Sequence, residues 1–225
     1  MPWPKKLVLV RHAESDGNVL TTEERTKCEL STQNYRLTER GRAQAKITGA
    51  YLRKRFGEFD HYYTSYYRRA IETLELMYPA VRRKEDPRLA EAQRGVYHSM
   101  TREEMAQHMP WELRRKEKEG LYHYRPPGGE NWPDIELRIH SFLGTLARDY
   151  YGQKVLIVVH GHWLILFQQL IHHFSIAEAV RRYHEHLAPN ASITIYGSTP
   201  LRHGRSHLHL QEEHLVPWTT QLSPN

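Results

Sequence analysis

Two aliphatic segments of the chain end abruptly on a histidine. The run KLVLV is followed by Arg11 and His12, and the run VLIVV is followed by His160. A neutral imidazole nitrogen is a competent nucleophile near pH 7, and the planar fork of an arginine binds two oxyanion oxygens at once. Arg69, in the segment SYYRRAIET, is a second candidate arginine. If Arg11, Arg69, His12 and His160 surround one phosphoryl group, the arginines and His160 supply positive charge and His12 supplies the nucleophile. These residue types are therefore suited to phosphoryl transfer.

The elements that carry these residues alternate between strand and helix. Consecutive apolar residues at 6–10 and 155–159 indicate strands that are covered on both faces. Further strands are predicted at 60–64, 192–196 and 206–210, and helices after Thr38, over 68–77, after Thr101, along WELRRKEKEG, behind RPPGGENWPD, after His160 and after Ser175. The pattern predicts an α/β three-layer sandwich, with a mostly parallel central sheet and helices on both faces. Ligands of such sheets bind outside the carboxyl ends of the strands, where His12 and His160 fall.

Composition indicates one folded domain over residues 1–225. Hydrophobic residues make up 39% of the chain and charged residues 26%, and 32 Lys and Arg against 26 Asp and Glu give a net charge of +6. A basic chain suits a phosphorylated metabolite or nucleic acid. No apolar run reaches the roughly eighteen residues of a membrane helix, MPWPKK is not a secretory signal, and the single Cys28 cannot form an internal disulfide. A cytoplasmic location is expected.

Six segments follow one another in an order that is typical of one family. Arg11 to Asn18 matches R-H-G/A-x-S/T-x-x-N at every defined position. SYYRRAIET matches S-x-x-x-R-A-x-x-T with Arg69 as its arginine, RLAEAQRG carries an acidic residue, Glu91, four positions before a glycine, and VVHGH carries His160. LTERGRAQA and PPGGEN complete the set. Over about residues 6–196 the chain thus resembles the histidine phosphatase superfamily, also called the phosphoglycerate mutase-like superfamily.

The resemblance implies a mechanism and a site. His12 would attack phosphorus to give a phosphohistidine while Glu91 protonates the departing oxygen, and water would then attack phosphorus. The implied catalytic residues are His12, Glu91, Arg11, Arg69 and His160, and the implied phosphate-binding residues are Arg11, Asn18, Arg69 and His160. No metal and no other cofactor is implied, because the positive side chains take the role of a divalent ion.

Several residues compete with these assignments. Glu72, Glu85 and Glu130 are alternative acids to Glu91. His162 makes a His-Gly-His with His160, which is typical either of a metal pair or of the start of the next helix, and the second interpretation is favoured. The C-terminal histidines His203, His207, His209 and His214 invite a metal assignment. SHLHL, however, alternates as a half-buried strand does, with both of its histidines, His207 and His209, on one solvent-facing side.

Hydrolysis is favoured over phosphoryl shuttling. Phosphoglycerate mutases resemble one another at E-R-H-Y-G, and here Glu91 begins the different run E-A-Q-R-G. We therefore predict a metal-independent phosphomonoesterase. A cofactor-dependent phosphoglycerate mutase and a non-catalytic phosphate- or nucleic-acid-binding module are the alternatives.

Substrate choice is expected to depend on two cap-like insertions, at about 19–36 and 99–125. Residues of the second insertion that are candidates for touching the substrate are Arg114, Arg115, Tyr122, His123, Tyr124 and Arg125. The expected partner is a small phosphorylated substrate. No membrane is expected, nucleic acid is not favoured, and a homodimer is left open.

Overall fold

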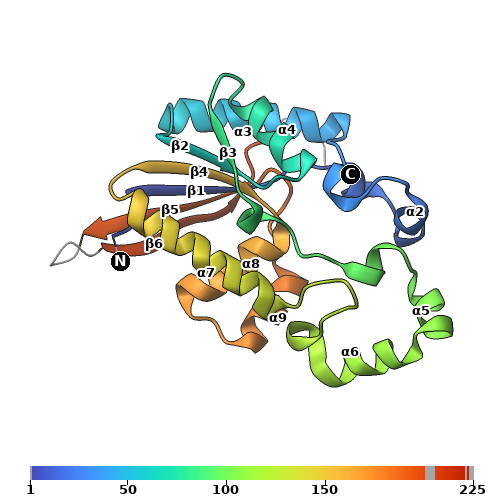
Figure 1. The fold of residues 1–225 in the computed structure, drawn as a ribbon. Helices are drawn as coiled ribbons and strands as arrows, with labels where there is room; N and C mark the ends of the chain where they lie inside the picture. The colour runs from blue at the N-terminus through green and yellow to red at the C-terminus, as the bar shows by residue number, and fades with distance from the viewer. Residues whose placement is uncertain (1, 201–205, 221, 223–225) are drawn as a thin grey trace.

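The buried strands predicted from the aliphatic runs lie at the centre of one mixed sheet (Figure 1). The structure is a computed structural model that describes residues 2–200, 206–220 and 222. Its strands are β1 (Lys6–Arg11), β2 (His61–Thr64), β3 (Arg83–Glu85), β4 (Lys154–Val159), β5 (Ile193–Pro200) and β6 (Ser206–Leu215). Its α-helices are α1 (Asp16–Val19), α2 (Thr22–Lys27), α3 (Glu39–Phe56), α4 (Arg68–Met77), α5 (Arg102–His108), α6 (Pro110–His123), α7 (Trp132–Asp149), α8 (Gly161–His172) and α9 (Ile176–Glu185), and its 3-10 helices are η1 (Thr32–Asn34), η2 (Pro87–Leu89) and η3 (Gly95–His98).

The strand order is β3-β2-β4-β1-β5-β6. β2 pairs in parallel with β3 and with β4, and β4 pairs in parallel with β1, whereas β5 and β6 are antiparallel to their neighbours. The central sheet is therefore mostly parallel, as predicted. Arg11 lies opposite Val159, so the two strands that precede His12 and His160 end level with each other.

Helices cover both faces of the sheet. Side chains of a strand alternate between the faces, so Val8 and Val10 pack with Leu52 of α3 and residues of α4. On the opposite face Leu7 and Leu9 pack against residues of α7, α8 and α9. Figure 1 shows α3 and α4 on one side of the sheet and α7, α8 and α9 on the other. The predicted three-layer α/β sandwich is confirmed.

The helix starts follow the predicted caps. Thr38 caps α3, and Thr101 and Glu104 form a capping box on α5. Ser175 caps α9 by accepting from the N–H of Glu178. β3 was missed, because Arg83–Glu85 is a short, exposed, fully charged edge strand with no apolar pattern.

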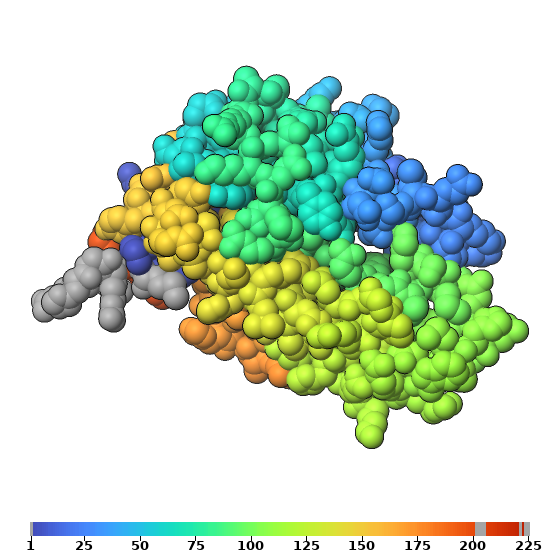
Figure 2. All heavy atoms as spheres, viewed as in Figure 1, coloured from blue at the N-terminus to red at the C-terminus, as the bar shows by residue number. Residues whose placement is uncertain are grey.

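The two predicted insertions lie beyond the carboxyl end of the sheet. α2 belongs to the first, α5 and α6 belong to the second, and Figure 1 shows them at the same end of the molecule. In Figure 2 the blue segment that contains α2 faces the green segment near α5 across a recess. Ion pairs run along α6, where Arg115 joins Glu112 at 3.0 Å and Glu119 at 2.9 Å, while Leu121 and Tyr122 at its end pack against the core. Among the described residues, no helix is long and apolar enough to cross a bilayer.

Candidate active site

The level ends of β1 and β4 bring two imidazole rings together. The His12 N–H donates to the Val159 carbonyl at 2.9 Å, which extends the parallel ladder by one residue. The ring centroids of His12 and His160 are 5.1 Å apart. Both residues are buried, with 3% and 0% of their surface exposed. Two histidines 148 positions apart in the sequence therefore meet because their strands are neighbours in the sheet.

The surroundings of His12 determine which ring nitrogen can react. Its Nδ1 lies 2.8 Å from the Ala13 carbonyl oxygen, which can only accept, so Nδ1 carries the proton. Nε2 is then the lone-pair nitrogen, and it accepts from Arg69 Nε at 3.2 Å. Burial lowers the pKa of His12 well below its ordinary value, and Arg69, His160 and Arg11 lower it further. The ring is neutral at pH 7 and has its basic nitrogen beside a guanidinium.

Arg69 is fixed in the first turn of α4. Its Nη1 donates to the Thr32 carbonyl at 2.8 Å. The Thr73 hydroxyl donates to the Arg69 carbonyl at 2.7 Å and accepts from the Ala13 N–H at 3.0 Å, which ties α4 to the loop after β1. Burial lowers the pKa of Arg69 to about 10, so the side chain remains charged at neutral pH.

Buried polar atoms without a protein partner surround His12. Arg11 donates through Nη1 to the Ala188 carbonyl, but its Nε has no hydrogen bond within the described chain. Neither ring nitrogen of His160 has a partner there. A buried polar group that lacks a hydrogen bond costs about 1–3 kcal/mol. Such a cost is explained if these atoms are there to meet a ligand.

His160 differs from its predicted electrostatic role. The sequence suggested that it supplies a positive charge, but burial and the nearby Arg69 lower its pKa well below the ordinary value of histidine. The ring is therefore neutral at pH 7 and offers a single N–H donor. Positive charge at the centre of the site comes from Arg11 and Arg69.

The side-chain oxygen of Asn18 is held by hydrogen bonds within the protein. Its Oδ1 accepts from the Ser15 N–H and hydroxyl, each at 3.0 Å, and from Asn190 Nδ2 at 3.3 Å. The same Asn190 amide donates to the His12 carbonyl at 3.0 Å. These donors define the orientation of the Asn18 amide, so its two Nδ2 hydrogens remain for a ligand of the cavity that Asn18 lines.

Glu91 lies in the same cavity and contacts a histidine that the sequence interpretation did not assign to it. Its Oε1 is 3.5 Å from His162 Nδ1 and accepts from the Ala92 N–H at 3.0 Å. Burial acts to raise the pKa of Glu91, but His162, His160 and the Ala92 N–H together hold it well below its usual value. His162 is the second residue of α8, as the favoured interpretation predicted, and its contact with Glu91 could not be read from the His-Gly-His spacing.

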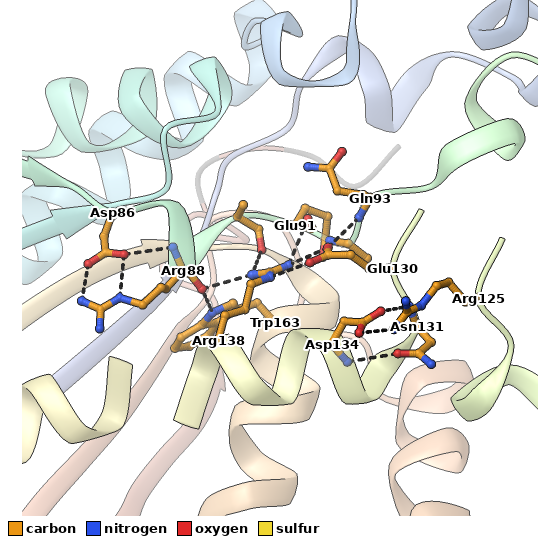
Figure 3. Close-up of polar contacts among 12 residues, drawn as sticks. Asp86, Arg88, Glu91, Gln93, Arg125, Glu130, Asn131, Asp134, Arg138 and Trp163 are labelled. Atoms are coloured by element: carbon orange, nitrogen blue, oxygen red, sulfur yellow. Dashed lines mark hydrogen bonds and ion pairs between the residues drawn. The ribbon is translucent and has the colours of Figure 1, made fainter. Parts of the chain in front are cut away.

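One arginine holds the segment that carries Glu91 (Figure 3). Arg138 of α7 donates to the main-chain carbonyls of Arg88, Ala90 and Glu91 at 3.1, 2.7 and 3.3 Å. Its remaining donors form a bidentate pair with Glu130 at 2.9 and 3.0 Å. All five N–H donors of the guanidinium are thus used.

The Glu130 side of this contact also has a structural role. Glu130 Oε2 accepts from the Gln93 N–H at 3.0 Å, and the Glu130 N–H donates to the Gln93 carbonyl at the same distance. Nearby, Gly95 adopts φ +51, and a Cβ there would lie 2.1 Å from the Pro127 carbonyl. The segments 88–95 and 127–130 therefore pack too closely at this point for any residue but glycine.

The geometry favours Glu91 over the three alternative acids. Glu91 is the only carboxylate among the described residues that line the cavity. The three alternatives are held by arginines: Glu72 by Arg68 at 2.9 Å, Glu85 by Arg83 at 3.1 Å, and Glu130 by Arg138 at 2.9 Å.

Most of the candidates in the second insertion make contacts within the protein. Arg115 pairs with glutamates of α6, Arg125 pairs with Asp134, and the Tyr122 hydroxyl donates to Glu136. Tyr124 lines a chamber beside the cavity, whereas Arg114 and His123 line none of the cavities described here. On β6 His207 is exposed and His209 is half-buried, as the alternation predicted, and His203 lies outside the described residues.

The cavity has a volume of about 140 Å³ and includes residues that the sequence interpretation did not single out. Besides Arg11, His12, Asn18, Arg69 and Glu91 it is lined by Thr22, Arg25, Tyr35, Arg94, Tyr97, His98, His162 and Tyr183, among others. In the sequence, Arg94 is one of the three positions at which E-A-Q-R-G differs from E-R-H-Y-G. No local pattern marks Arg25, which comes from the first insertion.

Comparison with known proteins identifies a family for this sequence. The family model of the histidine phosphatase superfamily, branch 1, matches residues 7–212. The chain is 28% identical over 205 residues to a 2,3-bisphosphoglycerate-dependent phosphoglycerate mutase of Rhizobium etli, a match that covers 84% of this chain and 89% of that protein. It is 29% identical over 157 residues to a 6-phosphofructo-2-kinase/fructose-2,6-bisphosphatase of Aquarana catesbeiana, and there the match covers 70% of this chain but spans only 30% of the relative.

The fold has solved counterparts as well. A putative alpha-ribazole-5'-P phosphatase of Escherichia coli superposes with a TM-score of 0.73 at 19% identity, over 95% of this chain and 98% of the other. Motif order, fold and the match of the family model over most of the sequence lead to one assignment: the chain belongs to the histidine phosphatase superfamily.

Proposed function

We propose that the protein is a metal-independent phosphomonoesterase that hydrolyses a small phosphorylated substrate through a phosphohistidine on His12. The observation that carries the proposal is the state of His12: a neutral ring, with Nδ1 bonded to Ala13 and Nε2 facing Arg69 at 3.2 Å. A phosphoryl group placed among Arg11, Arg69 and His160 would lie next to that nitrogen. The unpartnered Arg11 Nε and His160 nitrogens would then gain oxygens to bind.

The first step would form the P–Nε2 bond and break the bond between phosphorus and the leaving oxygen. Glu91 would give a proton to that oxygen, which matters most for an alkoxide. Because its pKa is low, Glu91 would receive this proton from the substrate monoanion, whose phosphate titrates near pH 6. In the second step water would attack phosphorus, the P–Nε2 bond would break, and Glu91 would take up a proton from the water.

Hydrolysis is preferred over transfer to a second hydroxyl because E-A-Q-R-G departs from the mutase run at three of five positions. The similarity to a Rhizobium etli mutase keeps that reaction as the second candidate. A non-catalytic binding module is not favoured, because the nucleophile and every phosphate ligand of the family pattern are present.

The test uses a generic aryl phosphate, with and without a chelator. We expect turnover that the chelator does not reduce, and a loss of about 10⁴-fold or more in His12→Ala. A denaturing quench at alkaline pH should trap a phosphoenzyme that is stable in alkali and is lost when the quenched sample is acidified. Conversion of one phosphoglycerate isomer into the other, faster than hydrolysis, would support the mutase. Tight phosphate binding without turnover of any ester would support the binding module.

A further inference from the structure

The cavity holds more positive charge than one phosphoryl group requires. Among the described residues, its lining includes four guanidinium groups, those of Arg11, Arg25, Arg69 and Arg94, and one carboxylate, that of Glu91. Arg11 and Arg69 are the pair closest to His12, as their effect on its pKa shows. A phosphoryl dianion held by these two would leave Arg25 and Arg94 without a counterion.

Neither of these outer arginines is neutralised by the protein. Arg25 uses its Nε to donate to the carbonyls of Leu20 and Thr21, at 3.2 and 3.3 Å, and its Nη atoms have no partner within the described residues. The Arg94 carbonyl accepts from the Tyr97 N–H at 3.2 Å, but its guanidinium has no hydrogen bond or ion pair with a described residue. Burial lowers the pKa of Arg25, and Arg94 lowers it further. Both guanidinium groups line the same cavity of about 140 Å³, so the two cations repel each other, and an anion between them would relieve the repulsion.

Their position suits the far end of a substrate. Arg25 comes from α2 in the first insertion and Arg94 from the turn before η3, so two separate segments of the chain contribute these side chains to the cavity lining. Arg94 also lines a second chamber of about 310 Å³, which shares Thr22, Ala92, Arg94, Tyr97, His162 and Tyr183 with the first. A leaving group that extends from phosphorus toward the second chamber would pass Arg94. Arg102 and Lys116, neither of them in an ion pair with a described residue, line that chamber too.

We propose that Arg25 and Arg94 form a second anion-binding subsite, which selects phosphomonoesters whose leaving group carries a carboxylate or a second phosphate. The proposal rests on the proposed function, because it names the substrate class of the same site. Arginine is suited to both anions, since its fork binds either one bidentately.

The test compares three esters with the same three-carbon leaving group: 3-hydroxypropyl phosphate, 3-phosphonooxypropanoate and propane-1,3-diyl bisphosphate. In the wild-type protein we expect kcat/KM to be at least about tenfold higher for one or both anionic esters than for the alcohol. In Arg25→Gln/Arg94→Gln this ratio should fall by about tenfold or more. Arg148→Gln, an exposed arginine on α7 paired with Asp149, is the control and should keep the ratio. The carboxylate and bisphosphate arms show which anion the subsite takes.

Two results would overturn the subsite: equal kcat/KM for all three esters in the wild type, or a preference that survives in the double variant. Failure of the proposed function looks different, because then no ester is hydrolysed by a folded protein. In that case calorimetry with the non-hydrolysable methylenephosphonate analogues replaces kinetics. Tighter binding of the anionic analogues, lost in the double variant, supports the subsite, and equal binding refutes it. Circular dichroism and thermal unfolding show whether each variant is folded.

Discussion

Arg138 gives the sharpest test of how Glu91 is held. Its five donors bind Glu130 and three main-chain carbonyls of the segment 88–91. In Arg138→Lys the charge remains, but three donors on a single nitrogen cannot reach the carboxylate and all three carbonyls. The Glu91 segment should therefore shift, while His12, Arg11 and Arg69, which are fixed by other contacts, stay in place.

The size of the effect follows from the role proposed for Glu91 as the general acid. A displacement of about 1 Å in a positioned group costs about 10²-fold in rate, and a general acid contributes about 10²–10⁴-fold in total. We expect kcat/KM for an alkyl phosphate to fall by about 10²-fold in Arg138→Lys. For 4-nitrophenyl phosphate, whose leaving group needs no proton, the fall should be about threefold or less.

The assay is kcat/KM with both esters, because this constant reports the steps up to phosphoenzyme formation and excludes the later attack of water. Arg148→Lys, on the same helix but exposed and paired with Asp149, is the matched control. Thermal unfolding of both variants checks that they are folded. An equal loss with both esters would show that Arg138 only stabilises the fold, and no loss with the alkyl ester would show that Glu91 does not depend on it.

Three further results are expected. Because the pKa of His12 is lowered, the His12 ring stays neutral as the pH falls through 6.5. Once corrected for ionisation of the ester, kcat/KM for an aryl ester should therefore stay level through that pH. A decline centred at pH 6.5 would contradict a neutral His12 as the nucleophile. Because the pKa values of His12 and His160 are lowered in the folded protein, the unfolded chain binds more protons than the folded one below pH 6.5. Stability is therefore lost as the pH falls from 6.5. His160→Gln should show a smaller drop in Tm between pH 7.5 and 5.5 than the wild type does. Gly95→Ala should reduce the free energy of unfolding by more than Gly152→Ala does, since both glycines have positive φ but only at Gly95 would the Cβ clash. Equal losses in urea titrations would argue against the close approach.

The parts of the site that the sequence predicted are those whose chemistry is local. Arg11 ends a buried strand and His12 follows it directly, and the pairing of β1 with β4 brings His160 to them. Register and residue type together determine these positions, so the motif and the strand pattern were enough. The three-layer architecture followed in the same way from consecutive apolar residues flanked by helical patterns.

Other features depend on contacts that no local pattern records. β3 consists of exposed charged residues and exists only because β2 offers it an edge. The contact between His162 and Glu91 joins α8 to a loop 70 residues earlier, and Arg138 reaches that loop from α7. Aromatic and charged residues of the second insertion looked available, yet Arg115, Tyr122 and Arg125 are used to hold the insertion itself.

This division has a physical origin that also limits what a motif can say about substrate. Phosphoryl transfer to histidine needs a nucleophile and cations within a few ångströms of one phosphorus, so adjacent residues and paired strands supply them. A leaving group would extend farther, to where Arg25 of the first insertion and Arg94 of the turn before η3 line the cavity, and the position of Arg94 depends on packing such as that of Gly95 against residues 127–129. A change in either segment can therefore move the outer cations without disturbing His12. Members of one family can thus share a reaction and differ in substrate, so the proposed substrate class is tested at the outer pair of arginines and not at the histidines.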